Sequence, residues 1–303
     1  MRGRLLEMGR LCIAFLAVMP FAVNTEKYPW LEQISRQEQL TIGCENLDPR
    51  ESSRRFDVTD LDHILVDRKH KLLYCYVPKV ACTNWKRVMM VLTGESTAAN
   101  LIDIPSSLAH SENSTLRLSQ LPSDEARACL EGYTMFLMAR HPFERLLSAY
   151  RNKFVDTLPS SKYFQSRYGR HIIKKYRRRP TMAEVASGAD VTFREFVRYL
   201  LKEGAKTNEH WTPLYDLCLP CSLNYTFVGH YETLSEDART VLDMVGAPSI
   251  VFPATRNGHT RDHLRTYFQQ LSIYEIQNLY RLYEPDFKLF GYGLEDILGY
   301  DLA

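Results

Sequence analysis

The sequence predicts an α/β protein in which a central parallel sheet is flanked by helices. Three short apolar runs rich in β-forming residues, at 72–77, 133–139 and 226–229, are typical of buried strands. The first two runs are each followed by a short loop and an amphipathic helical pattern, as in strand–loop–helix units. The chain of 303 residues, with 45% hydrophobic and 24% charged residues, has an ordinary globular composition.

The first unit begins with the apolar run 72–77 and is ended by Pro78, which cannot donate to a strand ladder. Thr83 or Asn84 is expected to cap the helix that follows, which places Lys79 in the loop before it. A lysine beside a helix N-terminus favours a phosphate or sulfate site, although most such loops bind nothing. The apolar face of this helix is formed by Trp85, Val88, Met89 and Leu92.

The second unit places Arg140 at the end of the run 133–139, where open α/β sheets bind ligands. Pro142 suits the first turn of the next helix. Two such units, each with a cation at the strand end, suit a ligand with phosphates at both ends. The expected core face of this helix is Phe143, Leu146, Leu147, Tyr150 and Phe154.

Other elements are less specific. A helical turn is expected to open the domain within 57–67, and 93–123 is rich in loops. Further helices are expected at 123–129, 193–201, 235–245, 261–271 and 274–283.

The segments 77–86 and 140–150 resemble the 5′-phosphosulfate loop and the 3′-phosphate motif of Golgi carbohydrate sulfotransferases. The closest group is the HNK-1 sulfotransferase family, which includes the chondroitin and dermatan N-acetylgalactosamine 4-O-sulfotransferases. The resemblance runs from about Leu61 to the C-terminus, and Ala139 and His141 depart from the usual pattern. Weaker similarities lie at 208–211, 218–221, 228–234 and 286–292.

The resemblance implies a P-loop-like sulfotransferase fold and transfer of a sulfuryl group from 3′-phosphoadenosine 5′-phosphosulfate (PAPS) to a glycan hydroxyl. The 4-hydroxyl of N-acetylgalactosamine in chondroitin or dermatan is the favoured acceptor. Alternatives are an HNK-1-type glucuronic acid 3-O-sulfotransferase and a non-catalytic luminal protein that binds glycosaminoglycan. A kinase is disfavoured because the chain has no G-x-x-x-x-G-K-[ST] motif.

The resemblance also implies roles for individual residues. Lys79 would neutralise charge on the bridging oxygen, Arg140 and Ser148 would hold the 3′-phosphate, and Arg145 would be a support or a core ion pair. The 5′-phosphosulfate would be bound by Pro78, Lys79, Val80, Ala81, Cys82, Thr83 and Asn84. The 3′-phosphate motif comprises Arg140, His141, Pro142, Phe143, Glu144, Arg145, Leu146, Leu147 and Ser148.

The acceptor hydroxyl also needs a general base. Candidates are His110, Glu209 and His210; we favour His110, which lies in the loop region between the two units. His210, beside Trp211, is alternatively a packing or sugar-binding residue, because aromatic rings suit a pyranose face. No metal is required.

The run 167–179 is basic with interleaved apolar residues and contains Arg177 and Arg178, which we predict to bind the acceptor. Such a run is most often a solvated helix face, but it also suits a sulfated or uronic-acid polymer. Because the net charge is only +2, any polyanion site must be a local patch.

The resemblance also implies a single-pass type II protein of the Golgi membrane. Residues 1–10 form the cytoplasmic tail, 11–23 a signal-anchor, 24–60 a stem and 61–303 the luminal domain. The short apolar run alone also suits a cleaved signal peptide. A luminal address excludes nucleic acid as a partner.

The chain has seven cysteines, and six of them lie outside the apolar segment and could form disulfides, which agrees with an oxidising lumen. Six cysteines permit fifteen connectivities. The pair Cys218 and Cys221 is better explained by structural disulfide bonding than by zinc or redox chemistry. Cys82 is alternatively a small buried residue. Asn113 and Asn224 lie in sequons and are predicted glycosylation sites.

Overall fold

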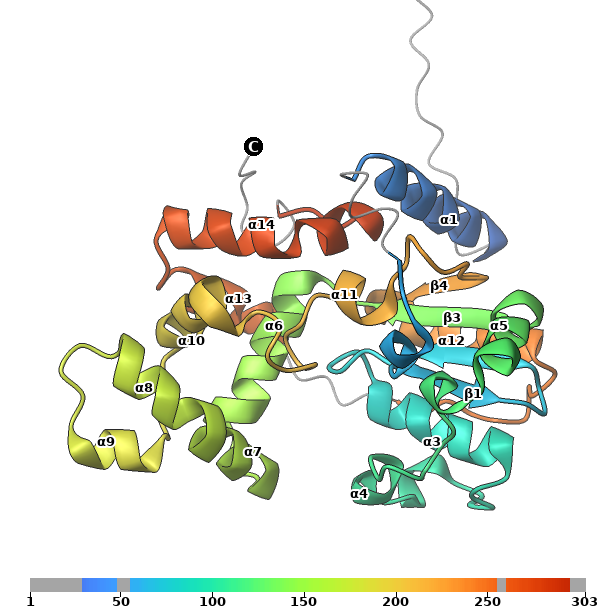
Figure 1. Cartoon of the computed structure of the whole chain (residues 1–303), viewed down its shortest axis with the longest axis horizontal. Coiled ribbons are helices and arrows are strands. Elements are labelled where there is room, and N and C mark those ends of the chain that lie inside the picture. Colours follow the sequence, from blue (N-terminus) through green and yellow to red (C-terminus); the bar gives the residue numbers. More distant parts are fainter. Residues whose placement is uncertain (1–28, 48–54, 255–259, 295–303) are drawn as a thin grey trace, which may run out of the picture.

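The computed structural model describes residues 29–47, 55–254 and 260–294. Its centre is a four-stranded sheet in the order β1 (Ile64–Asp67), β2 (Leu72–Cys75), β3 (Thr134–Ala139) and β4 (Phe227–His230). β2, β3 and β4 are parallel, with Tyr74 opposite Phe136 and Phe136 opposite Phe227. The three predicted strands and the α/β class are thus confirmed. The sheet lies at the right of Figure 1.

β1 makes the sheet mixed, because it runs antiparallel to β2. The helical turn predicted within 57–67 is present only in its first half, at Val58–Leu61. The second half, Ile64–Asp67, is a fully buried strand. It pairs with β2 from Ile64 opposite Cys75 to Asp67 opposite Leu72, and four residues connect the strands. A short apolar run can satisfy its backbone groups equally well as helix or strand, and here the neighbouring strand edge decides.

The remaining elements are helices. In chain order they are α1 (Pro29–Glu45), η2 (Val58–Leu61), α3 (Cys82–Thr93), η3 (Leu101–Asp103), α4 (Ser106–Ala109), η4 (Leu118–Gln120), α5 (Ser123–Gly132), α6 (Pro142–Tyr150), η5 (Arg151–Val155), α7 (Pro159–Phe164), η6 (Gln165–Gly169), α8 (Arg170–Tyr176), α9 (Met182–Ser187), α10 (Phe193–Tyr199), η7 (Leu200–Gly204), α11 (Leu214–Cys218), η8 (Tyr231–Thr233), α12 (Leu234–Met244), α13 (Thr260–Phe268) and α14 (Ile273–Leu289). Of these, η5, η6 and η7 are π-helical, a rare geometry that often marks functional positions.

The described residues bury two hydrophobic clusters. One surrounds the sheet and includes the predicted face of α3, with Trp85, Val88, Met89 and Leu92 all buried. The other lies among α6, α7, α8, α10, α13 and α14, at the left of Figure 1. It contains the whole predicted face of α6, from Phe143 to Phe154. Both helical faces are confirmed, because each apolar stripe has a core to cover.

α1 belongs to the folded domain, although 24–60 is predicted as a stem. It lies beside α14 at the top of Figure 1 and also packs against β4. Its buried Arg36 donates to Asp237 at 2.8 Å, and Cys44 is bonded to Cys221. The folded domain therefore begins upstream of Leu61. The parts of the predicted stem at 24–28 and 48–54 lie outside the described residues.

Two disulfides connect distant parts of the chain: Cys44 with Cys221, and Cys75 with Cys218. Structural disulfides are therefore confirmed at Cys218 and Cys221, each with a separate partner. They fix α11 and the loop after it to β2 on one side and to α1 on the other. Cys82 and Cys129 are buried free thiols, so Cys82 is the small buried residue that the sequence offered as an alternative.

The predicted tail at 1–10 and signal-anchor at 11–23 lie outside the described residues. Within the described ranges, no helix has the length and apolar character needed to cross a membrane.

Candidate active site

The loop between β2 and α3 has an unusual backbone. Lys79 and Ala81 have positive φ values of 72° and 53°, a conformation that non-glycine residues adopt at a cost. Ala81 is the N-cap residue of α3, and no side chain caps the helix. The predicted caps, Thr83 and Asn84, lie one and two residues inside the helix, so that prediction is wrong. The first turn of α3 therefore begins with backbone N–H groups that no side chain caps, which suits an anion.

The side chains of Thr83 and Asn84 also meet protein partners. The Thr83 hydroxyl lies 2.9 Å from Nε2 of His110. The amide of Asn84 donates to the carbonyl of Pro253 and accepts from Arg87. The start of α3 is thereby fixed to the segments that carry His110 and Pro253.

Lys79 projects from this loop toward the π-turn after α6. Its Nζ donates to Oδ1 of Asn152 at 3.1 Å. Burial, with repulsion from Lys153 and Arg140, lowers the pKa of Lys79 to about 8. An ammonium held among cations favours a bound anion, because the anion supplies the missing counter-charge.

Two further lysines line the same region, and the sequence analysis gave them no role. Lys153, on η5, lies over the Phe164 ring at 4.4 Å, and Lys86, on α3, lies over the Tyr76 ring at 3.9 Å. Burial lowers the pKa of both ammonium groups. Lys86 ends the first motif and Lys153 follows the second, so their positions were visible, but only the fold brings them together.

Arg140 connects the two units. It follows the last residue of β3, and its Nη1 donates to the backbone carbonyl of Lys79 at 3.1 Å. Nη2 lies 3.3 Å from Glu144, and the guanidinium lies over the Tyr231 ring at 4.2 Å. Its Nε is buried with no hydrogen-bond partner among the described residues. A buried unpaired donor of this kind fits a site for an anionic group, such as the 3′-phosphate of PAPS.

Arg145 has a different function from Arg140. Its buried guanidinium donates to three backbone carbonyls: Pro78 at 3.0 Å, Thr212 at 2.7 Å and Glu209 at 2.9 Å. It thus holds the Lys79 loop to the segment 209–212. This geometry matches a support rather than a ligand for phosphate.

The rest of the second motif consists mainly of structural residues. His141 is the N-cap of α6, accepting from the backbone of Phe143 through Nδ1 and meeting the Gly293 carbonyl at Nε2, 2.9 Å away. Pro142 occupies the first helical turn. Ser148 is half-buried. The side chains of Phe143, Leu146 and Leu147 lie in the hydrophobic cluster around α6, and so contribute packing.

The three candidate bases lie near the same cations. Burial, with repulsion from Lys153 and Lys79, lowers the pKa of His210 to about 2. Burial, then repulsion from Lys86, lowers the pKa of His110 to about 4. Both rings are therefore neutral at neutral pH. Trp211 is fully buried and donates to the Gly204 carbonyl, so its ring is not offered to a sugar.

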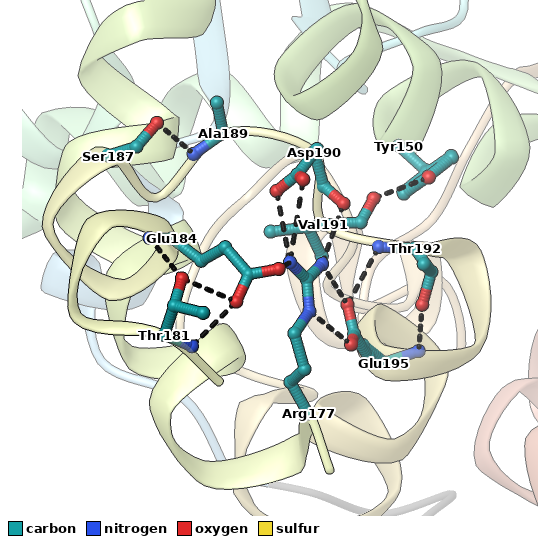
Figure 2. Close-up of polar contacts among 10 residues, drawn as sticks. All are labelled: Tyr150, Arg177, Thr181, Glu184, Ser187, Ala189, Asp190, Val191, Thr192 and Glu195. Atoms are coloured by element: carbon teal, nitrogen blue, oxygen red, sulfur yellow. Dashed lines mark hydrogen bonds and ion pairs between the residues drawn. The ribbon is translucent and has the colours of Figure 1, made fainter. Parts of the chain in front are cut away.

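Arg177 is enclosed by carboxylates rather than open to solvent (Figure 2). It makes a bidentate pair with Glu195, at 2.9 and 3.0 Å, and also contacts Glu184 and Asp190 at 3.1 and 3.2 Å. Glu184 and Glu195 are also the capping-box residues of α9 and α10. Arg177 thus joins the starts of two helices, and contact with an acceptor would require these pairs to break.

Arg178 differs from Arg177, because its side chain is exposed. The segment 159–179 contains eight basic and no acidic residues. Within the described structure, several of these have no ion-pair partner and are exposed: Lys162, Arg167, Arg170, Lys174, Arg178 and Arg179. The start of this segment adjoins the site, since Phe164 packs against His210 and lies under Lys153.

The two sequon asparagines, Asn113 and Asn224, are both exposed. Across the described ranges, no group of three or more His, Cys, Asp or Glu side chains is arranged to hold a metal ion.

Comparison with known proteins gives a consistent result. A family model described as "Sulfotransferase family" matches residues 62–293. The chain is 41% identical to carbohydrate sulfotransferase 11 of Mus musculus over 274 residues, which is 88% of this chain and 77% of that protein. It is 45% identical to carbohydrate sulfotransferase 14 of Danio rerio over 78% of this chain and 64% of that protein. Identity to carbohydrate sulfotransferase 8 of Homo sapiens is 34%, over 86% and 62%. No solved structure is a significant match.

Proposed function

Since the chain belongs to the sulfotransferase family, we propose that it sulfates the 4-hydroxyl of N-acetylgalactosamine in chondroitin or dermatan. The resemblance drawn from the two motifs is confirmed by the family match, and with it the P-loop-like sulfotransferase fold. The chain is a PAPS-dependent carbohydrate sulfotransferase, so a non-catalytic binding protein is set aside. The acceptor and the roles of individual residues are the proposal.

The observation that carries the donor site is the junction of the two motifs, where Arg140 donates to the carbonyl of Lys79. PAPS supplies an activated sulfuryl group together with phosphates at the 5′ and 3′ positions. The N–H groups at the start of α3 would bind the sulfuryl and 5′-phosphate oxygens. Lys79 would neutralise charge on the departing oxygen, and Arg140 and Ser148 would bind the 3′-phosphate. Catalysis then rests on positioning and charge stabilisation, as in phosphoryl transfer.

The acceptor is proposed to lie on the side of His110, Glu209 and His210. A polymer leaving this site would pass the exposed basic residues of the segment 159–179, including Arg178. Their charge suits the carboxylates and sulfates of a glycosaminoglycan. In this proposal Arg177 contributes by holding the basic segment in place.

We also propose that the protein is anchored in the Golgi membrane by residues 11–23, with its catalytic domain in the lumen. Two disulfides and two exposed sequon asparagines support an oxidising, glycosylating compartment. Protease protection of intact Golgi vesicles tests the orientation: protection of the C-terminus is expected, and its digestion without detergent would contradict the proposal.

The acceptor is tested with the full chain and radiolabelled PAPS, offered chondroitin, dermatan and a glucuronic-acid-terminated glycan in parallel. We expect label in chondroitin or dermatan, and digestion to disaccharides should place it at the 4-position. Label only in the third glycan would retain the reaction and replace the acceptor by glucuronic acid. Lys79→Ala, which should abolish transfer, is the control that the incorporated radioactivity arises from this site.

A further inference from the structure

Glu209 has a rigidly held backbone and a partly open side chain. Arg145 holds its carbonyl, and the turn that follows is closed by Trp211 and Thr212, which donate to the Asn208 carbonyl at 3.2 and 3.0 Å. The side chain keeps 37% of its surface exposed. A carboxylate that is fixed at its backbone and still reachable is suited to meet a substrate.

The Glu209 carboxylate lies beside a hydroxyl and an imidazole. The Tyr76 hydroxyl donates to Oε2 at 3.3 Å, and Nε2 of His63 lies 3.7 Å from the same oxygen. Nδ1 of His63 lies 3.1 Å from the Tyr76 carbonyl, which can only accept. Nδ1 therefore carries the hydrogen of the neutral ring, which leaves Nε2, 3.7 Å from Glu209, as the nitrogen that can accept. Nε2 of His63 is therefore placed to accept a hydrogen bond from Glu209 once the carboxylate has gained a proton.

The two histidines that compete for the role of base lie in a less favourable environment. A proton on His110 would create a further cation beside Lys86 and Lys153, whose repulsion already acts on that ring. Nδ1 of His210 is engaged by Asn208 at 2.7 Å, and its ring lies near Lys153 and Lys79. Burial is the first obstacle to a charge on either ring, whereas protonated Glu209 carries no charge.

We infer that Glu209 is the catalytic base of the sulfotransfer, and that His63 is a positioning residue that accepts a hydrogen bond from protonated Glu209. The assignment rests on the proposed function. The acceptor hydroxyl gives its proton to the Glu209 carboxylate while its oxygen forms a bond to sulfur. The bond from sulfur to the bridging oxygen breaks, and its electron pair leaves on that oxygen with 3′-phosphoadenosine 5′-phosphate.

The test uses the full chain with Glu209→Gln, which keeps size and shape but removes the basic oxygen. We expect kcat to fall by about 10²–10⁴-fold, while the dissociation constant for 3′-phosphoadenosine 5′-phosphate stays within about twofold. Glu236→Gln, an exposed change on α12, is the matched control and should behave as wild type. His110→Gln should lower kcat by less than Glu209→Gln does.

His63 is tested by replacing one ring nitrogen at a time. His63→Gln carries a polar atom near the position of Nε2, and His63→Asn carries one near Nδ1. We expect His63→Gln to retain most of kcat and His63→Asn to lose about tenfold, with KM unchanged in both. In a Glu209→Gln background, either change at His63 should have no further effect on kcat, because the coupled proton is gone.

Several outcomes would overturn the inference. One is a Glu209→Gln enzyme with at least half of wild-type kcat; another is a larger loss in His110→Gln. Failure of the proposed function has a separate signature: wild type itself would bind the nucleotide and sulfate none of the three glycans, and the assignment of a base would then fall with it.

Discussion

At the scale of single residues, Lys79 has an energetically unfavourable backbone conformation and an ammonium group in unfavourable surroundings. It has a positive φ, lies near Lys153 and Arg140, and its ammonium has Asn152 as a hydrogen-bond partner. Such a residue is costly to keep in the folded state and useful when an anion arrives.

We predict that Lys79→Met lowers kcat by about 10³-fold or more, because the departing oxygen would lose the cation proposed to neutralise its charge. The fold should remain, as judged by circular dichroism and by a melting temperature at or above that of wild type. Lys69→Met, an exposed change in the β1–β2 turn, is the control and should retain activity. An active Lys79→Met enzyme would remove Lys79 from the mechanism.

Arg177 should act on stability rather than on the acceptor. Arg177→Gln leaves the largely buried Glu195 without its bidentate partner, and we expect a loss of about 1–3 kcal/mol in the free energy of unfolding. Denaturant titration measures the loss. A double-mutant cycle with Glu195→Gln should give a stabilising coupling energy between the two side chains. A stable Arg177→Gln protein with a raised acceptor KM would restore the role in acceptor binding.

At the scale of elements, the segment from α7 to α8 separates a buried apolar face from an exposed basic one. Ile172 and Ile173 are fully buried, whereas Arg170 and Lys174 are exposed. His171 and Lys175 are paired with Glu203 on η7, which fixes the helix without using the unpaired cations.

Changing Arg170, Lys174, Arg178 and Arg179 to glutamine should therefore raise KM for a polymeric acceptor about tenfold at low salt, with kcat and melting temperature unchanged. The rise should shrink as salt is added, because screening removes the attraction that the cations supply. Initial rates with long and short acceptors provide the measurement. Equal KM values for the quadruple variant and wild type would show that these four residues form only a solvated surface.

The elements also show where periodicity succeeds and where it fails. The apolar stripe from Phe143 to Phe154 predicted the α6 face, because burial selects one side of a helix whatever its last turn does. The π-turn at Arg151–Val155 was not predictable. It is set by contacts with α7, such as the Ser161 hydroxyl on the Asn152 carbonyl, and it governs the placement of Lys153.

At the scale of the whole molecule, the lowered pKa values of Lys79, Lys86 and Lys153 make the free energy of unfolding depend on pH. Lys79 has a folded pKa of about 8 against an ordinary value of 10.5, so the folded state binds fewer protons than the unfolded state between these values. Stability should therefore rise with pH across this window, by at most about 1.4 kcal/mol per pH unit from this group.

Thermal unfolding between pH 7.5 and 10 measures this slope, and Lys79→Met should reduce it. Because the pKa values of Lys86 and Lys153 are lowered too, a smaller slope of the same sign should remain in that variant. Saturation with 3′-phosphoadenosine 5′-phosphate should flatten the wild-type slope by restoring counter-charge. Identical slopes in wild type and Lys79→Met would contradict the shifted pKa.

The arrangement of distant segments was the least predictable level. α1 has a weak apolar pattern, and its docking depends on Arg36, Asp237 and the Cys44–Cys221 bond, none of which local sequence specifies. The choice of base likewise depends on contacts that local sequence does not specify. Glu209 was one of three candidates until the fold placed His63 and Tyr76 beside it. The strand and helix around the Lys79 loop were predictable, because their apolar patterns are formed by neighbours along the chain.

The pairing of the four bonded cysteines also bears on biosynthesis. Cys44 and Cys75 are made early, but their partners follow 177 and 143 residues later. During translation, the two early thiols can therefore meet each other long before either correct partner exists. Closing a short loop is also entropically easier than closing a long one, which favours Cys44–Cys75 and Cys218–Cys221 as transient wrong pairs. Folding in the cell should thus depend on thiol exchange catalysts, and the yield of folded enzyme should follow their supply.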